Sequence, residues 1–189
     1  MKTLRLKIYS LIAILVLTAG IVFASTYQTL AFDFPNGAGN WHVAYHRKIT
    51  NETIVQYVPS GQNYTNWSET LVLHSYRNVN ARTPLAFLRR LTAQLEAMND
   101  YSKYQYERVT PSDAIATRCV VGNSRMPAQC DIYRAMESFE GYVTMQYINK
   151  DMESFKANYF KWMETIRQAR PYQSVFRNDR YLNKDNFEL

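Results

Sequence analysis

The clearest pattern of hydrophobic and polar positions lies near the end of the chain, between Asp151 and Arg170. Its large apolar side chains recur at the three- and four-residue intervals of one helix face, at Phe155, Tyr159, Trp162, Met163 and Ile166. Charged side chains fill many of the positions between them. An apolar stripe of this kind must be buried, so the pattern predicts a helix that packs on a sheet formed by the preceding segments.

Shorter stretches with alternating apolar and polar residues, many of them rich in β-branched or aromatic side chains, predict strands before this helix. These stretches cover residues 41–49, 53–58, 68–76, 101–109, 113–121, 130–139 and 142–148. In the first stretch, we expect Trp41, Val43 and Tyr45 on one face of the sheet. We also expect Trp67 to anchor the loop between the second and third strands to the body of the protein.

A second helix is predicted from Thr83 to Asn99. Thr83 suits the N-cap, and Pro84 suits the first helical position, where its missing N–H has no partner to lose. The predicted order is therefore β-β-β-α-β-β-β-β-α. Runs of consecutive strands interrupted by single helices favour an α+β fold, with an antiparallel sheet of about six to seven strands and two main helices.

The N-terminal 24 residues have the features of an export signal. A basic start is followed by an uncharged apolar run from Ile8 to Ala24, and small residues precede a predicted cleavage after Ala24. The alternative is an uncleaved membrane anchor, but 17 residues are near the lower limit for a bilayer span, which favours cleavage. Residues 25–40 contain Pro35, Gly37 and Gly39 and predict a flexible N-terminal arm. Residues 41–189 then form a single α+β domain with an aromatic, basic C-terminal tail.

The net charge limits the kinds of partner that the sequence indicates. The formal charge is +6, and three of the basic residues lie in the export signal. The remainder has 19 basic and 16 acidic residues, a net charge of +3 that is too small to indicate a nucleic-acid partner. We expect membrane contact only if the signal stays uncleaved. A protein or glycan partner in the cell envelope or outside the cell is expected instead.

Cys119 and Cys130 are the only cysteines, and they flank an irregular loop. Export leads to an oxidising compartment, so a disulfide between them is predicted. The alternative is a redox-active pair, but their spacing differs from the Cys-x-x-Cys pattern of redox enzymes.

The sequence offers little support for a metal site or for catalysis. His42 and His46 are separated by about 13 Å along an extended strand, and His74 has no acidic cluster beside it, so no metal site is predicted. No Gly-x-Ser-x-Gly motif or cofactor-binding motif is present. A pair of catalytic carboxylates remains an open alternative. The candidates lie in or near predicted strands, at Glu52, Glu69, Glu107 and Glu137.

Aromatic and basic side chains form the candidate binding surface. In the tail, Arg177 and Arg180 alternate with aromatic residues, a pattern that can grip a carboxylate, a phosphate or a glycan. The same pattern also suits a strap that packs its aromatic rings on the sheet and leaves its arginines in water. Together with Trp67 and Tyr57, these two arginines are the predicted binding residues.

Two stretches of the sequence resemble a pattern in small exported proteins of Gram-negative bacteria. In residues 52–69, a strand ends in Val-Pro-Ser-Gly-Gln and Asn-Trp-Ser-Glu opens the next strand. Residues 141–147, the Trp-containing helix and the Arg-Asn-Asp-Arg tail are similar to the same group. The resemblance extends over about two thirds of the mature chain. It implies export and a fold type, and no catalytic residue follows from it.

Three hypotheses about function follow. The first is a periplasmic or secreted binding protein without enzymatic activity, which fits the export signal and the lack of a catalytic motif. The second is a component of the cell envelope or of a secretion machine. The third is a secreted hydrolase that uses acidic residues.

Overall fold

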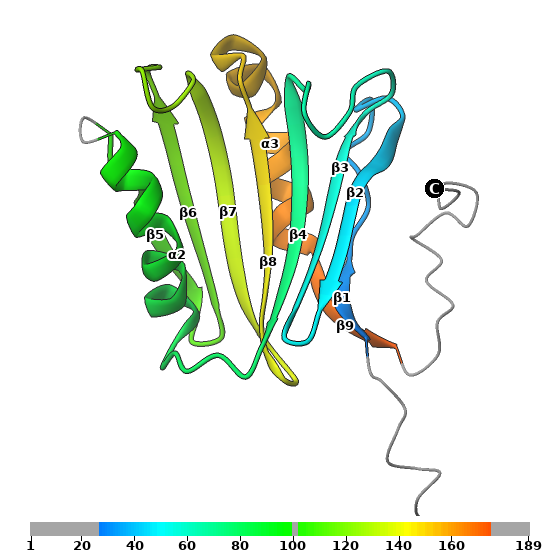
Figure 1. Ribbon diagram of the computed structural model, residues 1–189, viewed down its shortest axis with the longest axis vertical. Helices are drawn as coiled ribbons and strands as arrows, with labels where there is room; N and C mark the ends of the chain where they lie inside the picture. The colour runs from blue at the N-terminus through cyan, green and yellow to red at the C-terminus, as the bar shows by residue number, and fades with distance from the viewer. Residues whose placement is uncertain (1–26, 100–101, 175–189) are drawn as a thin grey trace, which may run out of the picture.

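The computed structural model describes residues 27–99 and 102–174 (Figure 1). Within these ranges the chain forms nine strands and two helices. The strands are β1 (Tyr27–Ala31), β2 (Trp41–Ile49), β3 (Glu52–Pro59), β4 (Glu69–Arg77), β5 (Gln105–Thr110), β6 (Asp113–Val120), β7 (Gln129–Ser138), β8 (Gly141–Asn149) and β9 (Arg170–Ser174). The helices are α2 (Pro84–Met98) and α3 (Met152–Gln168).

Seven of the strands form one antiparallel sheet in the order β2-β3-β4-β8-β7-β6-β5. The chain builds β2 to β4 from one edge, and α2 then carries it to the far edge. There β5 begins a run of hairpins that returns to β4, so β4 and β8 close the middle of the sheet. The predicted α+β fold class, with its antiparallel sheet and two helices, is confirmed.

One face of this sheet carries α3 and the larger hydrophobic core. Trp162 and Ile166 of α3 are buried against side chains such as Leu71, Met145 and Tyr147. The Trp162 ring stacks on the Tyr147 ring with centroids 4.1 Å apart. The apolar stripe that the sequence shows in α3 is therefore the contact between this helix and the sheet.

The prediction of a flexible arm over residues 25–40 is wrong for the part that the structure describes. β1 pairs with β9 in a separate two-stranded antiparallel sheet, and Leu30 is buried. Beyond β1, Phe32 and Phe34 pack against Tyr57 and the larger core. The missed signal was the alternation of apolar residues from 30 to 34, because the glycines mark only the turn that follows.

Three details of the elements also differ from the sequence prediction. α3 ends at Gln168, and Pro171 lies in β9, a strand that the sequence did not reveal. In β2, a bulge between Val43 and Tyr45 shifts the pairing with β3. Because side chains alternate across a strand, the bulge turns Tyr45 to the face opposite that of Trp41 and Val43.

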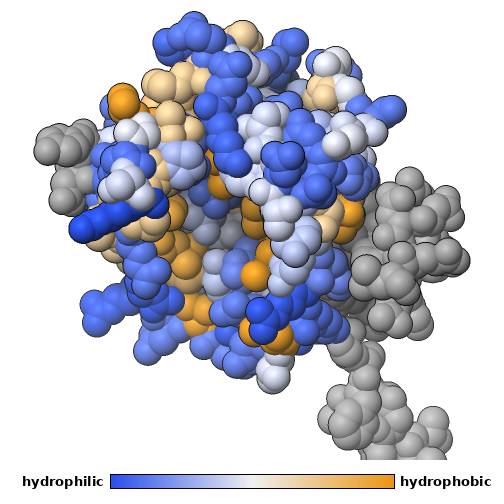
Figure 2. Space-filling model, turned by 45° about the horizontal axis from the view of Figure 1, so that its top comes forward, coloured by the Kyte–Doolittle hydropathy of each residue, from blue (hydrophilic) through white to orange (hydrophobic). Residues whose placement is uncertain are grey.

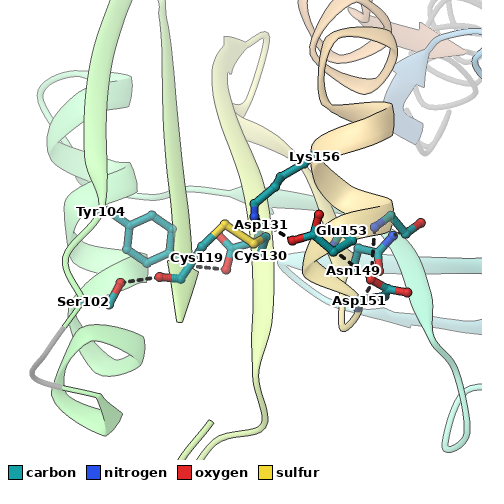
Figure 3. Close-up of a disulfide and its surroundings, with 10 residues drawn as sticks. Ser102, Tyr104, Cys119, Cys130, Asp131, Asn149, Asp151, Glu153 and Lys156 are labelled. Carbon is teal, nitrogen blue, oxygen red and sulfur yellow. Dashed lines mark hydrogen bonds and ion pairs between the residues drawn. A yellow bond between two sulfur atoms is a disulfide. The ribbon is translucent and has the colours of Figure 1, made fainter. Parts of the chain in front are cut away.

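The disulfide between Cys119 and Cys130 is confirmed, and it joins directly opposite residues of β6 and β7 (Figure 3). The bond closes a loop with a sequence separation of 11. In the chain-entropy description, a loop of that length stabilises the folded state by about 3 kcal/mol.

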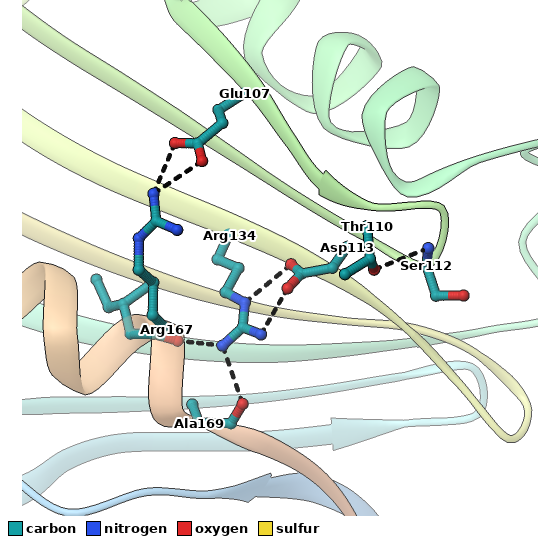
Figure 4. A network of polar contacts seen from close by, with 8 residues as sticks. Glu107, Thr110, Ser112, Asp113, Arg134, Arg167 and Ala169 are labelled. Carbon is teal, nitrogen blue, oxygen red and sulfur yellow. Dashed lines mark hydrogen bonds and ion pairs between the residues drawn. The ribbon is translucent and has the colours of Figure 1, made fainter.

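A buried ion pair connects the sheet to the end of α3. Arg134 on β7 forms two hydrogen bonds with the carboxylate of Asp113 on β6, at 2.7 and 2.9 Å (Figure 4). The same guanidinium donates to the backbone carbonyls of Ile166 and Ala169, where the helix ends. These carbonyls lack partners within the helix and carry partial negative charge, so the arginine satisfies both the helix end and the aspartate.

We predict that Arg134→Ala lowers the free energy of unfolding by about 3–5 kcal/mol, because it leaves Asp113 buried and unpaired. Urea denaturation measures this change. Arg167→Ala is the matched control, since Arg167 pairs with Glu107 at a site where the two side chains are 41% and 52% exposed. The control should lose no more than about 1 kcal/mol. Equal losses in the two variants would contradict a special role for Arg134.

Candidate functional site

The two faces of the seven-stranded sheet are covered unequally. α2 packs mainly on β5, β6 and β7, and it reaches the ends of β4 and β8 through Phe87, which contacts Tyr76 and Tyr142. The rest of β2, β3, β4 and β8 has no covering helix on that side (Figure 1). A helix is about 10–12 Å across and strands are about 4.8 Å apart, so a single helix covers only two or three strands. On the opposite side, α3, β1 and an aromatic cluster cover the same strands.

Burial alternates along most of β3 and β4, two of the strands that α2 leaves largely uncovered. In β3 and β4, Val55, Leu71 and Leu73 face α3 and are buried, whereas their neighbours Gln56 and Val72 are only half-buried. We call the half-covered surface the open face. Its half-buried residues include Tyr45, Ile54, Gln56, Val72, His74 and Gln146, whereas Val58, Thr70 and Thr144 on the same side are buried. Figure 2 shows a hollow in the middle of the molecule, with pale and orange surface within it.

Four residues of the open face form one row across four strands. Tyr45 lies opposite Gln56, Gln56 opposite Val72, and Val72 opposite Gln146. Neither glutamine side chain has a hydrogen-bond partner among the residues that the structure describes. Both side chains are only half-buried, so their amides reach water and are available to a ligand.

His74 and Glu52 form an ionisable contact at the border of the open face. The imidazole Nε2 is 3.3 Å from a carboxylate oxygen of Glu52, and its ring stacks on that of Tyr76. Burial lowers the pKa of His74, while Glu52 partly opposes that shift. A neutral imidazole held by a carboxylate could act as a general base. However, none of the hydrogen bonds described here joins the His74 imidazole to a serine, threonine or cysteine side chain, and Thr144 donates only to the His74 backbone carbonyl, at 3.4 Å.

A second polar cluster lies beneath α2, next to the disulfide (Figure 3). The hydroxyl of Tyr104 donates to Asp131 at 3.0 Å, and the guanidinium of Arg118 lies 4.4 Å from the Tyr104 ring centre. Arg118 also donates to the carbonyl of Leu95 near the end of α2, at 2.9 Å. Among the described residues, one oxygen of Asp131 and the Nε of Arg118 have no partner.

Burial dominates the ionisation of Asp131. Its side chain is 1% exposed, and removal from water raises its pKa to about 7, although Tyr104 and Arg118 act in the opposite direction. Asp131 therefore changes charge near neutral pH. Because this residue lies in the core beneath α2, its titration bears on stability rather than on direct contact with a ligand.

The four glutamates that were candidates for a catalytic pair do not converge. Glu52 contacts His74, Glu69 accepts a hydrogen bond from Tyr147 at 2.6 Å, and Glu107 pairs with Arg167. Glu52 and Glu69 align with opposite ends of β4 and β8, and Glu137 is exposed near the end of β7. No two of these residues share a site, so the structure gives no support to the carboxylate-pair hypothesis.

The predicted binding residues have different locations. Tyr57 is 6% exposed and packs in the larger core, so it is not part of the surface. Trp67 is half-buried, and Lys150 lies over its ring at 3.8 Å and donates to its carbonyl at 2.8 Å. Trp67 thus anchors its loop, as predicted, and a role in binding stays a prediction. Arg177 and Arg180 lie outside the described residues.

The open face itself was not predicted from the sequence. The alternation in β3 and β4 shows that Gln56 and Val72 point away from the buried side chains. It does not show which helix covers which face, and the sequence does not reveal the bulge in β2 that determines the position of Tyr45.

The bulge also places His42 and His46 on opposite faces of the sheet. No group of three metal-ligating side chains occurs within 27–99 and 102–174. Neither α2 nor α3 has the length and apolarity that a bilayer crossing requires.

We predict that the free energy of unfolding of the wild-type protein declines from about pH 4 to about pH 7 through Asp131, whose proton is held more tightly in the folded state. Asp131→Asn removes this contribution. Urea denaturation at pH 5 and pH 8 should therefore show that the variant gains stability relative to wild type at the higher pH. The gain should exceed about 1 kcal/mol, because one pKa unit corresponds to about 1.4 kcal/mol. The exposed Glu153→Gln control should not change the pH profile, and an Asp131→Asn profile identical to that of wild type would contradict the prediction.

A comparison with protein families and with curated proteins places the chain among known sequences. The search of curated proteins finds no match. A family model matches residues 37–173, which span all seven strands of the main sheet and both helices. The chain therefore belongs to the family of uncharacterised bacterial proteins that this model describes.

Proposed function

We propose that the protein is exported and binds a ligand on the open face, without catalysing a reaction. The observation that carries the proposal is the row of Tyr45, Gln56, Val72 and Gln146, in which two amides have no partner among the described residues. Ligand sites combine apolar and aromatic walls with a few polar groups, and this row has the same composition.

Two features support export. The disulfide between β6 and β7 fits an oxidising compartment. The first 24 residues have the sequence of a cleavable signal, although they lie outside the described residues. The alternative is a protein that stays in the cell envelope as part of a larger assembly. Cell fractionation distinguishes this alternative from a freely exported binding protein. A hydrolase is less well supported, because the candidate glutamates have separate partners.

Export predicts that the protein recovered from the periplasm or the medium lacks residues 1–24 and contains no free thiol. Intact mass spectrometry with and without reduction measures both properties. A Cys119→Ala/Cys130→Ala variant provides the mass reference for a chain without the disulfide. Recovery of the full-length chain from the cytosol, with both thiols free, would contradict export.

Binding on the open face predicts that Val72→Lys removes the thermal stabilisation produced by a ligand. A panel of saccharides, short peptides and small apolar molecules is screened for an increase in the melting temperature of the wild-type protein, which binding to the folded state produces. Val72 lies in the middle of the row and is half-buried, so lysine can reach water without unfolding the sheet.

Val121→Lys is the matched control, because Val121 is 77% exposed and lies outside the open face. Compounds that stabilise the wild-type protein should stabilise this control equally. Circular dichroism of the unliganded variants checks that both are folded. If the compounds stabilise Val72→Lys as much as wild type, they bind elsewhere and the proposal is wrong.

A further inference from the structure

The spacing of the two free amides constrains the size and chemistry of the ligand. Gln56 and Gln146 lie on either side of Val72, with one strand between their own strands. At about 4.8 Å per strand, their backbones are about 10 Å apart. Each amide offers both a donor and an acceptor. A ligand that satisfies both must extend across the row and must carry groups that donate as well as accept.

Charged groups are scarce on the open face. Glu52 lies at one border and contacts His74, whose pKa is lowered by burial so that the imidazole is neutral at pH 7. Arg47 lies opposite Ile54 on the edge strand β2 and is exposed to solvent. A charged ligand would lose part of its hydration at the centre of the face without gaining an opposite charge there. A neutral ligand is therefore favoured.

Aromatic rings stand at one end of the row. Tyr45 and Tyr64 lie with ring centroids 6.0 Å apart and planes 34° apart, and Tyr64 is 56% exposed. A tyrosine ring offers an apolar surface with a polar edge. Sugar rings are complementary to such a surface, because they present C–H groups on a face and hydroxyl groups around the rim.

We propose that the open face binds a neutral oligosaccharide, an inference that rests on the proposed function of this face. The hydroxyl groups of the ligand exchange hydrogen bonds with Gln56 and Gln146, and one sugar ring packs on Tyr64. A lipid chain is less suitable, because it would bury the two amides without satisfying them. An extended uncharged peptide could form hydrogen bonds with both amides. It would contact Tyr45 and Tyr64 only if it carried a suitable side chain at that end of the row.

Isothermal titration calorimetry tests this proposal on the protein purified with its disulfide intact. The probes are neutral oligosaccharides of glucose, galactose or N-acetylglucosamine units, their sulfated counterparts, and a set of uncharged peptides. At least one neutral oligosaccharide should bind. Gln56→Ala and Gln146→Ala should each weaken its binding about fivefold, the effect of one lost hydrogen bond. Tyr64→Ala should also weaken it. Gln168→Ala is the matched amide control, because Gln168 lies on α3 on the other side of the sheet.

The outcomes separate this inference from the proposed function. The protein could instead bind a peptide or a sulfated sugar more tightly than any neutral sugar, with weaker binding in Gln56→Ala and Gln146→Ala. This result would contradict a neutral saccharide as the ligand, but it would support the open face as a binding surface. Saccharide binding that is unchanged in both amide variants would contradict both proposals. So would the absence of binding by every probe. Unchanged melting temperatures of the unliganded variants exclude unfolding as the cause of any loss.

Discussion

Both helices are held at their C-terminal ends by arginines from neighbouring strands. Arg118 on β6 donates to the Leu95 carbonyl of α2, and Arg134 on β7 donates to the last carbonyls of α3. The two side chains point to opposite faces of the sheet, and each belongs to a cluster that includes an aspartate of the other strand, Asp131 or Asp113. Buried guanidinium groups are costly unless their charge is balanced, so the helix ends and the aspartates stabilise one another. These contacts tie the C-terminal ends of α2 and α3 to the β6–β7 pair, which the disulfide also joins.

This anchoring determines where the sheet remains uncovered. With α2 held at one end, β2, β3 and most of β4 and β8 have no helix on that side. The other side is closed by α3, by the β1–β9 pair and by the rings of Phe34, Trp41 and Trp162. The half-buried tyrosine, glutamine and histidine side chains on this face present polar groups beside an apolar surface, which is the combination found in ligand sites. The proposed binding function follows from this asymmetry, and not from any single catalytic residue.

The local elements of this fold could be predicted from the sequence, whereas their long-range arrangement could not. Alternation located seven strands, the apolar stripe located α3, and the two cysteines gave the disulfide. The pairing of β1 with β9 joins residues near 30 to residues near 170, and no local pattern records it. The bulge in β2 reversed the face of Tyr45, and Tyr57 proved to be a core residue because α3 and the aromatic cluster lie on its side. The row that contains Gln56 and Gln146 depends on the register of β3, β4 and β8, which the sequence of each strand leaves undetermined.

The central claim is that the face of the sheet beside α2 is accessible in the folded protein. Thiol labelling of two adjacent positions in β4 tests it most directly, because Val72 points to the open face and Leu73 to the α3 core. The account predicts that a maleimide reagent reacts rapidly with the native Val72→Cys variant and slowly with Leu73→Cys until denaturant is added. Equal protection of both thiols in the native protein would show that the open face is covered and would contradict the account.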